Sequence, residues 1–498
     1  MKNFIWLLLL ALAFATACTK QASNTAAVNA TPPAFSSIQE NELRRDLFIL
    51  AGDSMRGKRA GTPDELRAAA WVAERARLAG LEPAGEDGTY FQFFPLRRIR
   101  VGDNARLQVN GKAIRLWQDA WVTAPVESKV DGSVVWLKSL ADTVGKNFKN
   151  KILAMPLQAP NPLPVKGMSL WGYRYILAAV RQQSNLLRNQ GAAAIMLVSD
   201  SVAENNLAFA GHGFEEGTYQ LAGTPVSASR INVPVILVRK ALASTLQNLH
   251  AKVTADISLE SFIYPSINVV AKAAGSDPVL RQEHVLFSGH HDHDGVGVPI
   301  AGDSIWNGAD DNASVSVALL AIGRAWKNKP GKRSALFVWH GAEERGLWGS
   351  RWYAEHPTVK KETIVAVLNG DMIGRNAPDS AALLGAIPPH RNSTALVEMA
   401  LQANKQFTRF NLDTSRDEQW HPEGWYFRSD HLPYARAGIP SIFFTTLLHP
   451  DYHTPRDEAQ RIDYAKLTRM TRWMYATGWL ISNTSQRPTV EPGFKLEH

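Results

Sequence analysis

Residues that could bind a metal ion gather in five short segments in the second half of this chain. The segments contain histidine, aspartate and glutamate, and most of them come just after an apolar stretch typical of a buried strand. They are residues 290–294, 307–312, 343–344, 371 and 453. Imidazole and carboxylate ligands without thiolate suit zinc, or cobalt or manganese as substitutes, in a hydrolytic site.

Five ligands are more than a single catalytic zinc ion needs, because such an ion takes three protein ligands and a water. Two ions that share one aspartate and a bridging water fit the count better. Two neighbouring ions lower the pKa of that water and stabilise a developing oxyanion. The adjacent Glu343 and Glu344 can divide the work, one binding metal and the other accepting the proton of the water.

The elements that must position these residues alternate between strands and helices. Apolar strands are expected at residues 285–288, 334–339, 364–368 and 441–445. Helices are expected at residues 313–327, 394–406 and 464–481. This order predicts an α/β fold with a mostly parallel, mixed sheet flanked by helices, whose ligands bind at the carboxyl ends of the strands.

The rest of the chain divides into segments of different character. Residues 37–121 and 265–498 are predicted to form one split catalytic domain, and residues 122–264 have a βα rhythm of their own, typical of an inserted domain. Residues 1–17 read as a signal peptide, and residues 18–36 as a polar tether. Cys18, the only cysteine, follows the apolar run as in a bacterial lipobox, so we expect it to be lipidated.

Composition excludes several classes of protein. The 498 residues are 45% hydrophobic and 20% charged, as in a globular protein. The net charge of +8 is spread along the chain without a basic run, so no nucleic-acid partner is expected. The sequence predicts an exported lipoprotein, anchored to the outer membrane through its lipid alone and facing the periplasm or the cell surface.

The motifs, in their order, resemble those of the co-catalytic di-zinc aminopeptidases, family 28 of the metallopeptidases. They are His290-x-Asp292 and residues 308–314, 342–350, 369–374 and 452–457. Residues 59–63 and 80–85 resemble the amino-terminal segment of the family, and the middle region resembles a protease-associated (PA) domain. The resemblance implies the zinc exopeptidase fold, two zinc ions per chain and peptide substrates.

The resemblance also implies a role for each site residue. The four terminal ligands would be His290 with Asp371 on one zinc, and Glu344 with His453 on the other. Asp310 would be the bridging carboxylate, with a cis peptide bond between Asp310 and Asp311. Glu343 would be the general base, Asp292 would orient His290, and Tyr452 would donate to the oxygen of the tetrahedral intermediate. His291, His293 and Asp294 are interpreted as pocket wall.

Several functions remain open at this point. An aminopeptidase that acts on peptides outside the cytoplasm is the leading hypothesis. A carboxypeptidase of the glutamate carboxypeptidase type shares the inserted domain, but no motif here locates the basic groups that it needs. A glutaminyl cyclase, or a receptor-like binding protein, would have lost ligands that this sequence retains. The sequence leaves the side-chain preference and the oligomeric state open, a dimer included.

Overall fold

The apolar strands of the second half of the chain pair in one large sheet. The computed structural model describes residues 31–158, 170–224, 233–421 and 423–496. The sheet has the strand order β19-β18-β20-β17-β13-β16-β12-β2-β9, with β1 paired to β12. Its strands are β1 (Glu82–Pro83), β2 (Phe91–Val101), β9 (Thr218–Leu221), β12 (Leu259–Ala273), β13 (His284–His290), β16 (Ser334–His340), β17 (Ile364–Gly370), β18 (Ser380–Leu384), β19 (Asn411–Leu412) and β20 (Ser441–Thr445).

The centre of this sheet is parallel, as the sequence predicts. β13 pairs with β16 on one side and β17 on the other, and β17 pairs with β20, all in parallel. The flanking pairs that β12 makes with β16 and β2 are antiparallel, so the sheet as a whole is mixed. Parallel strands all end at the same edge, which places the residues after β13, β16, β17 and β20 close together.

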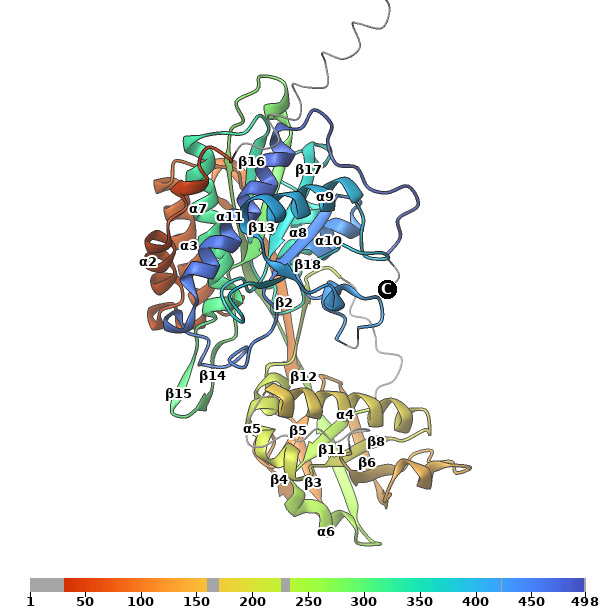
Figure 1. Ribbon diagram of the computed structural model, residues 1–498. Coiled ribbons are helices and arrows are strands. Elements are labelled where there is room, and N and C mark those ends of the chain that lie inside the picture. The colour runs from red at the N-terminus through yellow and green to blue at the C-terminus, as the bar shows by residue number, and fades with distance from the viewer. Residues whose placement is uncertain (1–30, 159–169, 225–232, 422, 497–498) are drawn as a thin grey trace, which may run out of the picture.

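Helices cover both faces of the large sheet, and this explains why its central strands are apolar on both sides. Val285 and Phe287 of β13 join the core under one helical layer, whereas Leu286 between them joins the core under the other. The first layer contains α2 (Glu40–Leu50), α3 (Pro63–Leu78), α7 (Ser314–Asn328), α9 (Thr394–Ala403) and α11 (Tyr464–Asn483). The second contains α8 (Trp348–Glu355) and α10 (His431–Arg436) (Figure 1).

A second, smaller sheet forms the inserted domain, with the strand order β4-β3-β11-β6-β7-β8-β10-β5. Its strands are β3 (Arg106–Val109), β4 (Lys112–Ile114), β5 (Ala120–Val122), β6 (Ser128–Trp136), β7 (Ile152–Pro156), β8 (Ala194–Val198), β10 (Val235–Val238) and β11 (Lys252–Ile257). Its helices are α4 (Leu170–Arg188), α5 (Ser201–Glu216) and α6 (Ala243–Leu246). β3 and β4 come before residue 122 and β5 ends at it, yet all three belong to the smaller sheet. The predicted boundary at residue 122 is therefore wrong, because the insertion begins soon after β2.

Two long paired strands connect the domains. β2 and β12 pair antiparallel from Phe91 with Val269 to Val101 with Leu259, and Figure 1 shows this ribbon running from the large sheet towards the smaller domain. A hairpin of β14 (Gly295–Ile300) and β15 (Asp303–Trp306) extends from the catalytic domain and contacts α5. The inserted domain therefore lies on the side of the large sheet where this hairpin emerges.

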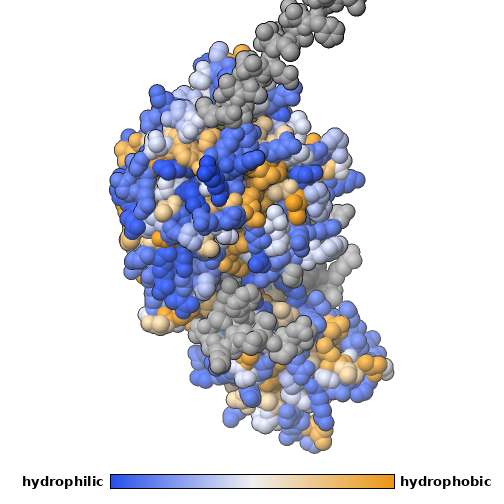
Figure 2. All heavy atoms as spheres, in the orientation of Figure 1, coloured by the Kyte–Doolittle hydropathy of each residue, from blue (hydrophilic) through white to orange (hydrophobic). Residues whose placement is uncertain are grey.

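Hydrophilic residues cover most of the face shown in Figure 2, with apolar residues interspersed on both domains. Among the residues that the structure describes, no helix combines the length and apolar character that crossing a membrane requires. The predicted signal peptide, Cys18 and most of the predicted tether lie outside the described residues.

Candidate metal centre

The first imidazole of the site ends the central strand β13. His290 is its last residue and is fully buried. Its Nδ1 atom lies 3.2 Å from the backbone oxygen of Asp292, and 3.7 Å from the Asp292 carboxylate. That carboxylate accepts hydrogen bonds from the backbone N–H groups of Glu343 (3.0 Å) and Glu344 (3.3 Å). Asp292 therefore orients His290 mainly through its backbone, and its side chain holds the Glu343-Glu344 loop in place.

The turn that leads into α7 supplies the carboxylate at the centre of the site. Oδ1 of Asp311 lies 3.2 Å from Nε2 of His290, and Oδ2 lies 3.1 Å from Nε2 of His453. Gly308 permits this turn, because its φ is +58° and a Cβ there would lie 2.4 Å from the His293 ring. Burial alone would raise the pKa of Asp311, but the close contacts with the imidazoles of His290 and His453 hold it well below its ordinary value.

Asp310, predicted as the shared carboxylate, does not lie between the imidazoles. Its Oδ1 atom accepts the backbone N–H of Gly374 at 2.6 Å, and its Oδ2 atom lies 3.5 Å from Nε2 of His449. The carboxylate of Asp457 accepts the backbone N–H of Asp310 and so fixes the turn. The cis peptide bond also lies one residue later than predicted, between Asp311 and Asn312. The prediction for Asp310 is therefore corrected to Asp311.

Two groups of ligating atoms meet at Asp311. In one, His290 lies with Asp371 (3.7 Å) and Glu343 (3.9 Å). In the other, Asp311 lies with Glu344, His453 and His293; Oε2 of Glu344 is 3.2 Å from Nε2 of His453, and Oε1 is 2.9 Å from Nδ1 of His293. The pairing of His290 with Asp371 and of Glu344 with His453 is the arrangement that the resemblance implied.

The chemistry of these groups fits two divalent cations. Nε2 of His290 and Oδ1 of Asp371 are buried and make no hydrogen bond of good geometry with other described residues. A buried polar atom without a partner is costly, and a shared cation would satisfy both atoms. The donors are nitrogen and oxygen only, as zinc accepts. The structure thus favours a two-metal centre with Asp311 as the shared ligand.

Glu343 is placed beside this centre. Burial raises the pKa of Glu343 well above its ordinary value despite the opposing charge of His290. A carboxylate with a raised pKa is a stronger proton acceptor than an exposed one. The position and environment of Glu343 are those that a general base needs.

The ring of Tyr452 packs against the imidazole of His453, with the two ring centroids 3.9 Å apart. The Arg428 guanidinium donates a hydrogen bond to the Tyr452 hydroxyl at 3.2 Å. Burial raises the pKa of Tyr452 above its ordinary value. The hydroxyl therefore stays protonated, and its own hydrogen remains free to be donated.

Sequence reasoning missed Asp311 and underestimated two other residues. His293 and Asp294 were expected to line the pocket, yet His293 contacts Glu344, and Asp294 lies 3.1 Å from Nδ1 of His453. A further missed group is Lys58, which is fully buried and donates to the backbone oxygen of Asn307. The only feature of the sequence that could have pointed to these four residues is that each lies in or beside a recognised motif.

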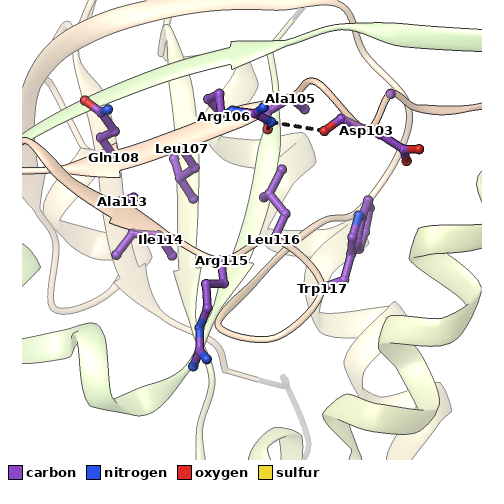
Figure 3. A pocket seen from close by; sticks show the side chains of 11 residues that line it. Asp103, Ala105, Arg106, Leu107, Gln108, Ala113, Ile114, Arg115, Leu116 and Trp117 are labelled. Carbon is purple, nitrogen blue, oxygen red and sulfur yellow. Dashed lines mark hydrogen bonds between the residues drawn. The ribbon is translucent and has the colours of Figure 1, made fainter.

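Of the hollows that the described residues form outside the groups of ligating atoms, one lies near Asp310 and another on the inserted domain. One, of about 600 Å³, is lined by Trp425, Leu447 and Leu448 and by His449, which faces Asp310. The other, of about 320 Å³, lies on the inserted domain beside Ile114, Arg115 and Trp117 (Figure 3). The first adjoins the candidate metal centre, and the second belongs to the other domain.

Part of the chain is similar to known peptidases. Residues 268–478 match the model of peptidase family M28. The chain is 25% identical over 249 residues to aminopeptidase YwaD of Bacillus subtilis (49% of this chain and 50% of that protein). It is 30% identical over 171 residues to a probable leucine aminopeptidase of Arthroderma benhamiae (32% and 44%). The chain thus spans about half the length, or less, of these curated relatives.

Solved structures share the fold over nearly the whole chain. An aminopeptidase from Aneurinibacillus sp. strain AM-1 superimposes with a TM-score of 0.58 at 17% identity, covering 92% of this chain and 97% of that one. The zinc aminopeptidase BSAP of Bacillus subtilis gives 0.57 at 17% identity, covering 90% and 96%. At this identity the likeness concerns the fold alone. The matched residues 268–478 form a domain of peptidase family M28, and this domain includes both groups of ligating atoms.

Proposed function

We propose that this chain is a di-zinc exopeptidase, specifically an aminopeptidase that removes amino-terminal residues from peptides outside the cytoplasm. The observation that carries the proposal is the position of Asp311, whose two carboxylate oxygens each face an imidazole from a different group of ligands. One carboxylate shared by two His-and-carboxylate groups is the donor set of a two-metal hydrolase.

The residues that would hold zinc follow from these groups. His290 and Asp371 would bind one ion, Glu344 and His453 the other, and Asp311 both. Zinc bound here would supply Lewis acidity and lower the pKa of water. Cobalt or manganese would suit the same nitrogen and oxygen donors.

The chain itself would move the proton. Glu343 lies 3.9 Å from Nε2 of His290, at the edge of the group of ligating atoms, and is buried. In the proposed reaction its carboxylate accepts a proton from the attacking water and then gives it to the leaving amine.

Tyr452 would stabilise the oxygen of the intermediate. Because Arg428 donates to the Tyr452 oxygen, the tyrosine hydrogen is available to the substrate. The guanidinium of Arg428 also favours the negative charge that develops on the oxygen of the intermediate. Tyr452 is thus proposed as a donor that acts on the substrate rather than on the metal ions.

The names of the relatives support amino-terminal cleavage. Aminopeptidase YwaD and the probable leucine aminopeptidase are described as enzymes that act at that end of peptides. These descriptions are of those proteins, and they set the direction of the test for this one.

The test combines metal analysis with hydrolysis of aminoacyl and carboxyl-terminal reporter peptides. We expect about two zinc ions per chain and cleavage at the amino end. Glu343→Ala should lower kcat by roughly 10²–10⁴-fold while keeping the metal. Glu355→Ala, which removes an exposed glutamate of α8, is the matched control and should leave kcat unchanged. Cleavage confined to the carboxyl end would indicate a carboxypeptidase, and a metal-free, inactive protein would indicate a binding protein.

We also propose that the chain is exported and anchored to a membrane through lipid on Cys18. The apolar run and its following cysteine support this proposal. In cells supplied with radiolabelled palmitate, the full chain should be labelled and sediment with membranes. Cys18→Ser should be unlabelled, and labelling that survives this change would contradict the proposal.

A further inference from the structure

A chain of ionic contacts leads away from the metal centre at His453. Nε2 of this imidazole faces Asp311 and Glu344, whereas Nδ1 lies 3.1 Å from Oδ2 of Asp294. An imidazole that binds metal through one nitrogen is oriented by the partner of the other nitrogen, commonly a carboxylate. Asp294 therefore occupies the place of the residue that orients His453.

The contacts continue from Asp294 into the other domain. Oδ1 of Asp294 lies 3.1 Å from Nη2 of Arg345, and Nη1 of the same guanidinium lies 3.3 Å from Oε2 of Glu216. The side chains of Glu216, Arg345 and Asp294 are only 6%, 11% and 15% exposed. Negative, positive and negative groups thus alternate between Glu216 and His453, in surroundings where their interactions are little screened.

Glu216 belongs to the inserted domain, where it is the last residue of α5. Arg59 contacts its Oε1 atom at 2.6 Å, and the Tyr219 hydroxyl donates to the same oxygen at 2.8 Å. The Arg98 guanidinium donates to the Glu216 backbone oxygen at 2.7 Å. These contacts hold the carboxylate in one position at the border between the domains.

Stability alone does not account for such a network. Buried ion pairs add little to stability compared with apolar residues of similar size, because removing charges from water is costly. In some proteins such pairs fix geometry, since each charged group accepts few arrangements of its neighbours. Here the group at the end of the network is an imidazole of the candidate metal centre.

We propose that Glu216 is a positioning residue for His453, acting through Arg345 and Asp294, so that the inserted domain completes the metal centre. This inference rests on the proposed function, because it assumes that His453 binds metal. It assigns the inserted domain a part in assembling the site itself.

The test measures metal binding as well as activity. In Glu216→Gln, the carboxamide keeps the shape of the side chain and removes its charge. Zinc affinity would be measured by competition with a chelator, and the cobalt-substituted protein would be examined by visible absorption and by NMR of the imidazole N–H protons. We expect about tenfold weaker binding of one of the two ions, at the low end for outer-shell changes, and a shifted N–H signal.

Two control variants separate positioning from docking of the domains. Arg174→Gln breaks another contact between the domains, the 2.6 Å ion pair of Arg174 with Glu423. Glu204→Gln breaks the pair with Arg239, which lies within the inserted domain and also involves α5. Both controls should keep the zinc affinity and the cobalt spectrum of the wild type.

If Glu216→Gln does not fold, Tyr219→Phe removes one hydrogen bond to Glu216 and should shift the N–H signal in the same direction. The inference would be overturned if the folded Glu216→Gln protein kept the zinc affinity and spectra of the wild type. Where Tyr219→Phe is used instead, the same result would overturn it. Either outcome would leave the proposed function intact. A wild-type protein that binds no zinc would instead overturn the proposed function, and the inference with it.

Discussion

Asp310 and Asp311 are neighbours in the chain, yet their carboxylates make entirely different contacts. Asp311 lies between the imidazoles of His290 and His453, whereas Asp310 accepts the backbone N–H of Gly374. One side chain faces the ligating atoms, and the other supports the backbone of the loop after β17. The two residues should therefore respond differently to the same substitution.

Replacing each aspartate with asparagine tests this difference. Asp311→Asn should weaken zinc binding by more than the 10–100-fold typical of outer-shell changes, because it neutralises a ligand shared by both ions. Asp310→Asn keeps an oxygen that can accept the Gly374 N–H, so it should retain both ions. Zinc per chain after dialysis against a weak chelator measures both effects. Loss of metal in the Asp310 variant, with metal retained in the Asp311 variant, would reverse the assignment.

The Tyr452 hydroxyl should contribute to kcat and not to metal binding. Tyr452→Phe keeps the ring that packs on His453 and removes the donor. We expect kcat to fall by about 10²–10³-fold, as for loss of one oxyanion donor, with KM and zinc content close to those of the wild type. Tyr90→Phe, which removes a hydroxyl bonded to the backbone oxygen of Leu81, serves as the control. An unchanged kcat in Tyr452→Phe would exclude the proposed role.

Removing the metal should reduce stability as well as activity. Without cations, the carboxylates of Asp311 and Glu344 lie close to each other, and like charges repel. Ions that bind the folded state alone stabilise it by about 2.7 kcal/mol when their free concentration is 100 times Kd. Calorimetry should show a lower Tm after treatment with 1,10-phenanthroline and recovery when zinc is added back. Equal Tm values in both states would argue against a metal centre at this position.

His284 lies at the start of β13, away from the ligands, and should make the free energy of unfolding depend on pH. Burial lowers its pKa to about 4, so the imidazole is neutral in the folded chain at pH values where the unfolded chain protonates it. The free energy of unfolding should therefore decrease as pH falls from about 6.5 to about 4, by up to about 3 kcal/mol from this residue. Urea unfolding across this range should show a weaker pH dependence for His284→Asn. Identical pH dependence in both proteins would show that His284 does not contribute.

The apolar patterns and motifs of the sequence are enough to predict the central strands and most of the ligand types. The apolar runs at residues 285–288 and 441–445 correspond to β13 and β20, because a strand buried on both faces must be apolar throughout. Four ligands could be predicted because each lies in a recognisable motif near the end of a strand: His290, Glu344, Asp371 and His453. Such local patterns depend on the neighbours of a residue in the chain, and a single sequence contains them.

Which side chains meet in the site depends on contacts between segments that are far apart in the sequence. Whether Asp310 or Asp311 faces the imidazoles depends on the path of the turn, which Asp457 fixes from a distant segment by accepting backbone N–H groups. The contact of Glu216 with Arg345 depends on how the inserted domain packs against the catalytic domain. The direction of a side chain in a turn is set by backbone torsion angles and remote partners, and no periodicity in the sequence records either of them.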